Sequence, residues 1–169
     1  MPQKTANELR EIITDINNEL ARLTQLQGQI HQAQTEITNN PALSSLLYES
    51  LALKFHNFYT GCERIFQIIA SELNGGLPSS YDWHRRLLIR MANPQAERPA
   101  VLTTETAKRL EEYLAFRHVV RNIYGFELDP RRLDNLLASY DQTWSAFEQD
   151  IRQFLDWLSQ LTEHLKSLS

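Results

Sequence analysis

The side chains with the most chemical potential in this 169-residue chain gather between positions 117 and 124. This segment holds Arg117 and Arg121 together with His118, Asn122 and Tyr124. At about 100° per residue, a helix would place both arginines and the tyrosine on one strip, with the histidine and the amide on a second strip beside it. An arginine offers a planar fork of donors to a phosphate, and a histidine can exchange a proton near neutral pH. The segment is therefore suited to metal-free cleavage of RNA, in which a base activates the ribose 2′-hydroxyl while an arginine offsets charge on the phosphate.

The same spacing also fits a purely structural role. Arg117 would then lay its stem along the edge of the core, Arg121 would pair with acidic neighbours, and Tyr124 would cover the core with its hydroxyl in water. Residue spacing alone favours this structural interpretation, because such edge residues are common in helical bundles.

Apolar residues at steps of three and four predict four long helices and one short helix. The expected ranges are 7–38, from about 47 to 73 before Asn74-Gly75-Gly76, 81–92 for the short helix, 104–124 with Thr104 as N-cap and Gly125 as terminator, and 130 to the C-terminus. Asp129-Pro130 is a typical helix start. No segment has a convincing strand pattern. We therefore expect an all-α, antiparallel four-helix-type bundle with one additional short helix, forming a single domain over residues 1–169.

The helical pattern also predicts how the 117–124 segment faces the core. Phe116, Val119, Val120 and Ile123 define an apolar face. Arg117 and Tyr124 would lie at the edge of that face, while His118 and Asn122 would point away from it. The polar groups should border a groove or an interface.

Composition and charge narrow the class of protein. With 42% apolar and 22% charged residues, the chain is typical of a soluble globular protein, and no apolar run approaches the ~20 residues that cross a bilayer. A single cysteine, Cys62, and no apolar signal segment indicate the cytoplasm. The net charge of −4 argues against binding nucleic acid over the whole surface, but residues 81–132 hold ten Lys and Arg against seven Asp and Glu.

Other residues are weaker candidates. Arg85 and Arg86 on the short helix, next to His84 and Trp83, could extend a basic path for RNA, although a solvated helix face anchored by a buried tryptophan is the favoured interpretation. No histidine spacing suggests a metal site, and no cofactor is expected. Residues expected to be structural are His31, His56, His164 and Cys62. The helical stripe of Trp144, Phe147, Phe154, Trp157 and Leu161 is expected to form core or dimer contacts.

The segment resembles the signature of the HEPN superfamily and, more narrowly, of HepT-like toxins: Arg, a polar residue, three residues, His, any residue, Tyr. Arg117 matches the arginine, His118 the polar position and Tyr124 the tyrosine, while Asn122 stands where the usual histidine would be. The resemblance implies an all-helical bundle that acts as a ribonuclease toxin at the cleft of a homodimer. It further implies an MntA-like nucleotidyltransferase antitoxin, which silences the toxin by transferring AMP to Tyr124.

Asn122 leaves three interpretations, because an amide cannot act as a general acid or base. The chain could belong to a branch that uses its own motif, with His118 transferring protons and Arg121 adding a second phosphate contact. It could be a naturally inactive member, or carry an altered residue that disarms a toxic product. The first is favoured. Two other functions are weighed with it: a catalytically silent HEPN module that binds a nucleotidyltransferase, and a helical adaptor without nucleotide chemistry.

Overall fold

A computed structural model describes residues 4–95, 98–122 and 128–168, without the side chains of Arg121 and Asn122. The described residues form five α-helices and one short 3₁₀ helix, with no strand among them. In chain order these are α1 (Ala6–Asn39), η1 (Pro41–Leu43), α2 (Ser44–Leu73), α3 (Trp83–Met91), α4 (Thr104–Asn122) and α5 (Pro130–Ser167). The expected all-α bundle of four long helices and one short helix is confirmed.

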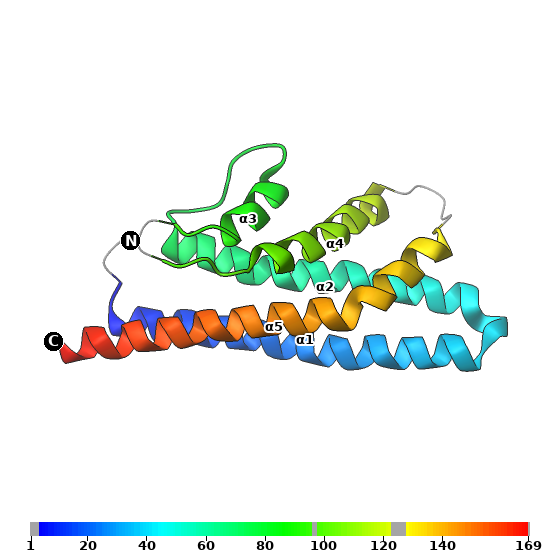
Figure 1. Ribbon diagram of the computed structural model, residues 1–169, viewed down its shortest axis with the longest axis horizontal. Helices are drawn as coiled ribbons and strands as arrows, with labels where there is room; N and C mark the ends of the chain where they lie inside the picture. Colours follow the sequence, from blue (N-terminus) through cyan, green and yellow to red (C-terminus); the bar gives the residue numbers. More distant parts are fainter. Residues whose placement is uncertain (1–3, 96–97, 123–127, 169) are drawn as a thin grey trace.

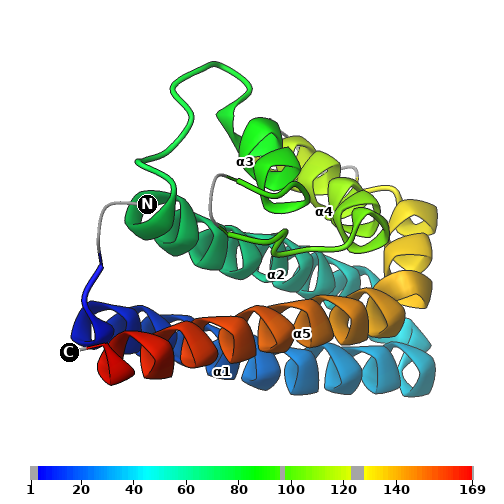
Figure 2. The same cartoon turned by 60° about the vertical axis from the view of Figure 1, so that its left-hand side comes forward.

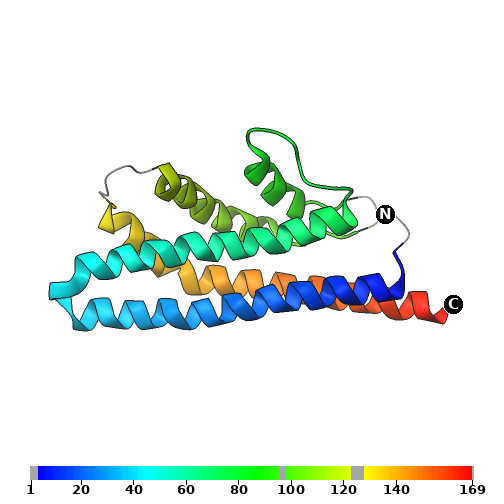
Figure 3. The same ribbon diagram turned by 180° about the vertical axis from the view of Figure 1, so that it is seen from behind.

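The four long helices run alternately up and down along the bundle (Figure 1). α1 and α2 form a long hairpin, and α5 returns beside α1, as the view from behind also shows (Figure 3). α4 packs on α2 and α5, and the short α3 lies on α2 and α4 (Figure 2). This arrangement makes α2 the central helix, so a polar side chain on its α3-facing and α4-facing side can reach both of those elements.

Local signals explain where most helices begin and end. Thr5 accepts a hydrogen bond from the Glu8 amide while the Glu8 carboxylate accepts one from Thr5, which is a capping box for α1. Asp129 caps α5 through its own side chain, as expected. For α4 the expected cap is wrong by one residue: Thr103, and not Thr104, accepts from the backbone amide of Thr106.

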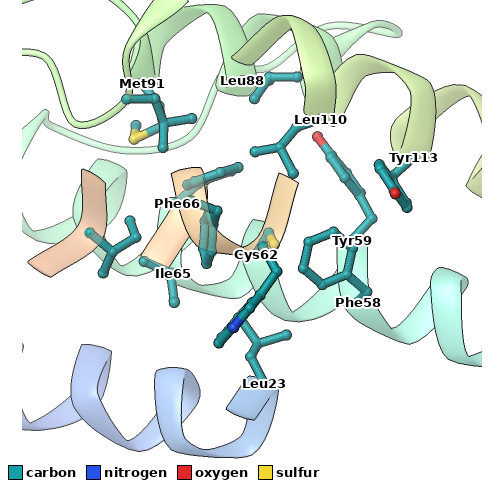
Figure 4. Packing of buried hydrophobic residues seen from close by; sticks show 14 of the residues in the cluster. Leu23, Phe58, Tyr59, Cys62, Ile65, Phe66, Leu88, Met91, Leu110 and Tyr113 are labelled. Carbon is teal, nitrogen blue, oxygen red and sulfur yellow. The ribbon is translucent and has the colours of Figure 1, made fainter. Parts of the chain in front are cut away.

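Figure 4 shows aromatic rings among the buried side chains of the core. Many of the core rings meet edge to face. The Phe58 ring lies 5.1 Å from both Tyr113 and Tyr140, measured between centroids, so it joins α2 to α4 and α5. Cys62 is fully buried, as expected for a structural cysteine. Leu53, an apolar residue of α2, is exposed on the outer face of that helix.

Two buried polar groups hold α3 and α4 in place. Arg98 donates to the Asn74 side chain and to backbone carbonyls that include those of Arg90 and Pro99, and burial lowers the pKa of its guanidinium to about 10. Asp150 on α5 accepts from the backbone amide of Thr103 at 2.8 Å. The end of α3 is therefore fixed to the end of α2, and the start of α4 is fixed to α5.

Candidate active site

Arg117, the first residue of the motif, is buried against α2. Its guanidinium Nη1 donates to Oε1 of Glu63 at 2.7 Å, and the two side chains are only 10% and 4% exposed. The sequence pattern placed Arg117 at the open edge of the core. In the structure Arg117 is buried instead, because Glu63 of α2 places a carboxylate in the core that neutralises the guanidinium.

His84, at the start of α3, completes this buried pair. Its Nδ1 lies 2.6 Å from the other Glu63 oxygen, Oε2. An ionised carboxylate only accepts hydrogen bonds, so Nδ1 carries the proton and donates it. Nη1 of Arg117 also lies 3.3 Å from Nδ1. Both groups are then donors, so they do not bond to each other, and they lie close together because both bind Glu63. Glu63 therefore binds an arginine from α4 and a histidine from α3 at the same time.

His118 is on the exposed side of this group. Its ring centroid lies 5.7 Å from that of His84, with the ring planes at 78°. The indole of Trp83 stacks on the His84 ring, with 3.7 Å between the centroids and an inclination of 29°. We call Glu63, His84, Arg117 and His118 the polar cluster. It brings two imidazoles and one guanidinium together where α2, α3 and α4 meet.

The inner wall of the polar cluster is aromatic. The guanidinium carbon of Arg117 is 6.0 Å from the centre of the Tyr59 ring. Burial, more than any neighbouring charge, raises the pKa of Tyr59, so its hydroxyl stays neutral. Within the described residues neither this hydroxyl nor Nε of Arg117 has a hydrogen-bond partner. The arginine thus keeps donors that Glu63 does not use.

The other predicted site residues are placed less completely. Arg121 and Asn122 belong to the last turn of α4, but their side chains lie outside the described part, as does the whole of Tyr124. Arg85 and Arg86 are exposed on α3. Arg85 approaches Glu111 at 3.8 Å, and Arg86 donates weakly to Ser80 at 3.3 Å. These partners lie outside the polar cluster, so neither arginine belongs to it.

Two members of the polar cluster were not predicted as site residues. Glu63 stands among apolar core positions of α2, beside Cys62 and one turn after Tyr59, and a lone carboxylate at a core position is the signal that would have found it. The sequence pattern assigns His84 only to a basic segment of the short helix. Its partner is 21 positions away on another helix, and no local spacing reveals such a pair.

The described residues meet neither the requirements of a metal site nor those of a membrane span. Among the described residues, no group of three or more His, Cys, Asp or Glu side chains is placed to hold a metal ion. In the same part of the chain, no helix combines the length and the apolar character required to span a bilayer.

The described residues form an all-helical bundle in which Arg117 and His118 lie near the end of α4. The family described as HepT-like protein matches residues 50–158, from α2 through most of α5. The chain therefore belongs to the HepT-like family of the HEPN superfamily. Proteins of this family are generally part of toxin–antitoxin systems, and HEPN domains dimerise. Neither the curated proteins nor the solved structures contain a match to this chain.

Proposed function

We propose that this protein is the toxin of a toxin–antitoxin pair and acts as a metal-independent endoribonuclease at the cleft of a homodimer. The observation that carries the proposal is the meeting of Arg117 and His118 with a second imidazole in the polar cluster, within the region that matches the HepT-like family. Guanidinium and imidazole groups supply charge stabilisation and proton transfer, which are the two requirements for attack by the ribose 2′-hydroxyl.

Each motif residue has a defined part in this reaction. Arg117 stabilises charge on the scissile phosphate through its guanidinium, which Glu63 holds in place and whose side chain is 10% exposed. His118 exchanges a proton with a reacting oxygen, because the amide of Asn122 cannot. Asn122 donates a hydrogen bond in place of the usual histidine, and Arg121 adds a second phosphate contact. Arg85 and Arg86 extend the path of the RNA along α3, where their exposed side chains are available to it.

The decisive test is cleavage of RNA by the purified protein, with and without EDTA, compared with the variants Arg117→Ala and His118→Ala. We expect cleavage that EDTA does not abolish and a loss of about 10²-fold or more for each variant. His164→Ala, an exchange of an exposed histidine at the end of α5, is the matched control. Intact RNA after incubation with wild-type protein at high concentration would contradict the proposed nuclease activity. Equal activity of all variants would exclude Arg117 and His118 from the reaction.

Silencing is proposed to follow from AMP transfer to Tyr124 by an MntA-like nucleotidyltransferase. The added phosphate would bring negative charge into an arginine-lined cleft and occupy the place of the RNA backbone. Incubation with the nucleotidyltransferase encoded beside this protein and ATP should raise the intact mass by one or more AMP groups. Tyr124→Phe should prevent the increase. An unchanged mass of the wild type would contradict this mode of silencing.

A catalytically silent HEPN module is the second candidate function. Two observations favour it: Asn122 occupies the usual histidine position, and Glu63 already neutralises Arg117 in a buried pair. This candidate predicts that wild-type protein leaves RNA intact while Asn122→His creates cleavage. The protein would still bind its nucleotidyltransferase, which co-purification of the two chains would reveal.

A further inference from the structure

The polar cluster contains a Glu–His pair outside the motif that the resemblance identifies. The carboxylate of Glu63 comes from the middle of α2, and the imidazole of His84 comes from the first turn of α3. Both are largely covered, with 4% and 12% of their side chains exposed. This pair lies beside His118, and its position raises the question of which group acts where Asn122 cannot.

We infer that His84 is the general base of the nuclease, that Glu63 is its positioning residue, and that His118 is the general acid. This inference rests on the proposed function and assigns its proton transfers. A carboxylate that accepts from Nδ1–H fixes the tautomer in which Nε2 carries the free lone pair, and it stabilises the imidazolium formed when that nitrogen takes a proton. In the described part of the chain, the His84 ring is hydrogen-bonded to Glu63 through Nδ1, so the geometry leaves Nε2 for this step.

The orientation of His84 is fixed from two sides. Glu63 holds one ring nitrogen at 2.6 Å, and the stacked indole of Trp83 covers one ring face. Its partial exposure shows that the ring still reaches the surface. His118 is the more exposed of the two histidines, which suits a group that meets a departing oxygen on the solvent side. With centroids 5.7 Å apart, the two rings can address oxygens on opposite sides of one phosphorus.

The reaction then follows without any co-reactant. Nε2 of His84 takes the proton of the 2′-hydroxyl, and the 2′-oxygen forms a bond to phosphorus. The bond from phosphorus to the 5′-oxygen breaks, and the imidazolium of His118 gives its proton to that oxygen. The products are a 2′,3′-cyclic phosphate and a 5′-hydroxyl end. Arg117, held by Glu63, stabilises the charge on the phosphate during the transfer.

The first test uses His84→Asn, because the asparagine amide can donate to Glu63 near the place of Nδ1 but cannot accept and release a proton. We expect a folded protein that binds RNA as the wild type does and cleaves it about 10²- to 10⁴-fold more slowly. Added imidazole should restore part of the rate. The matched control is His31→Gln, which alters another His–carboxylate pair, between His31 and Asp141, away from the polar cluster. Full activity of His84→Asn would overturn the inference while leaving the nuclease in place.

The second test separates base from acid. In a substrate whose 5′-bridging oxygen is replaced by sulfur, the leaving group departs without a proton. His118→Gln should regain most of its lost rate on this substrate, whereas His84→Asn should not. Recovery by His84→Asn and not by His118→Gln would reverse the two assignments and overturn the inference. If wild-type protein cuts neither substrate, the proposed function fails, and the inference fails with it.

The third test needs no RNA. Nitrogen NMR of the histidine rings reports which nitrogen carries the proton. We expect His84 in the Nδ1–H form in the wild type and a mixture of tautomers in Glu63→Gln, whose amide no longer presents two anionic oxygens. A wild-type His84 in the Nε2–H form would overturn the assignment even in an active, fully folded enzyme.

Discussion

Glu63 and Arg117, 54 positions apart in the chain, form a buried ion pair with 2.7 Å between Oε1 and Nη1. The pair connects the middle of α2 to the last part of α4, and the same carboxylate also accepts from His84 on α3. Three helices that carry the proposed site therefore share one acceptor. The properties of this acceptor lead to the first prediction.

Replacing Glu63 should destabilise the fold more than replacing an exposed glutamate. In Glu63→Ala the guanidinium of Arg117 remains buried without a counter-charge, which costs about 3–5 kcal/mol of unfolding free energy. Glu111→Ala, which removes the partner of exposed Arg85 at 3.8 Å, should cost about 0–1 kcal/mol. Urea denaturation monitored by circular dichroism measures both. The double variant Glu63→Met, Arg117→Met should recover much of the loss, and equal instability of the single and double variants would contradict the ion-pair explanation.

Two helical glycines should respond to alanine in opposite ways. At Gly28, on the exposed side of α1, an added Cβ meets no atom within 4 Å, so Gly28→Ala should stabilise the protein by about 0.5–1 kcal/mol. At Gly61 an added Cβ would lie 2.5 Å from Cδ2 of the buried Leu23, where α1 and α2 approach closely. Gly61→Ala should therefore destabilise by about 1–3 kcal/mol, offset in part by its better helix propensity.

Thermal melting of the two glycine variants gives the comparison. Adding Leu23→Ala to Gly61→Ala should make the alanine at position 61 less costly, because it removes the atoms that clash. A Gly61→Ala variant that melts above the wild type would show that the two helices are not in close contact at this point.

Stability should decline in alkaline solution because core tyrosines resist ionisation. Burial raises the pKa of Tyr113 to about 12, and its hydroxyl donates to the carbonyl of Leu136 at 2.8 Å. In the unfolded chain the phenol of Tyr113 ionises near its ordinary pKa of about 10. Below that pH the phenol is neutral in both states, and its contribution to folding stability is complete. Between about pH 10 and 12 only the unfolded chain loses the proton, so the free energy of unfolding falls as pH rises. Burial raises the pKa of Tyr140 in the same direction. Tyr113→Phe should reduce the slope of unfolding free energy against pH above about 10, and an unchanged slope would exclude Tyr113 as a contributor.

The Cys62 thiol should be unreactive in the folded protein. It is fully buried, and burial raises its pKa well above the ordinary value, so very little thiolate is present at neutral pH. A thiol reagent such as Ellman's reagent should label it only at the rate at which the protein opens, and quickly in urea. Rapid labelling of the native protein would mean that the α2 core is more open than described.

Exposed arginines of α3 should tune RNA affinity without affecting the chemical step. Arg85→Ala and Arg86→Ala should weaken RNA binding uniformly across sequences and lower the salt slope by about 0.7 for each phosphate that the variant no longer neutralises. The bound RNA should still be cut at the wild-type rate. Arg152→Ala, which removes an exposed arginine on α5 that pairs with Glu148, is the control. Unchanged affinity for RNA in both α3 variants would show that Arg85 and Arg86 do not contact the RNA.

The fold follows from signals that are local in the chain. Apolar residues at steps of three and four mark the long helices, and Asp129-Pro130 marks the start of α5 at the observed residue. Local signals are less exact where tertiary contacts decide. The short helix predicted from Tyr81 begins at Trp83, and α4 is capped by Thr103 with the help of Asp150. A cap shared with another helix cannot be identified from neighbouring residues.

Only half of the candidate site could be predicted in this way. Arg117 and His118 are adjacent in the chain and match a known motif, so they could be named from it. Glu63 and His84 join them through packing between helices. The burial of Arg117 was missed for the same reason, because the carboxylate that makes burial tolerable lies on α2. Electrostatic partners across a bundle depend on register and rotation of helices, which hydrophobic periodicity does not specify.

Because α3 is short, it can detach from the bundle while the long helices stay folded. A nine-residue helix is not stable alone in water, so α3 keeps its shape through its contacts with α2 and α4 and through the bonds of Arg98. Detachment of this one segment would carry away an imidazole and leave the long helices packed. Sub-global opening at α3 would therefore take His84 out of the proposed site while the long helices remain folded.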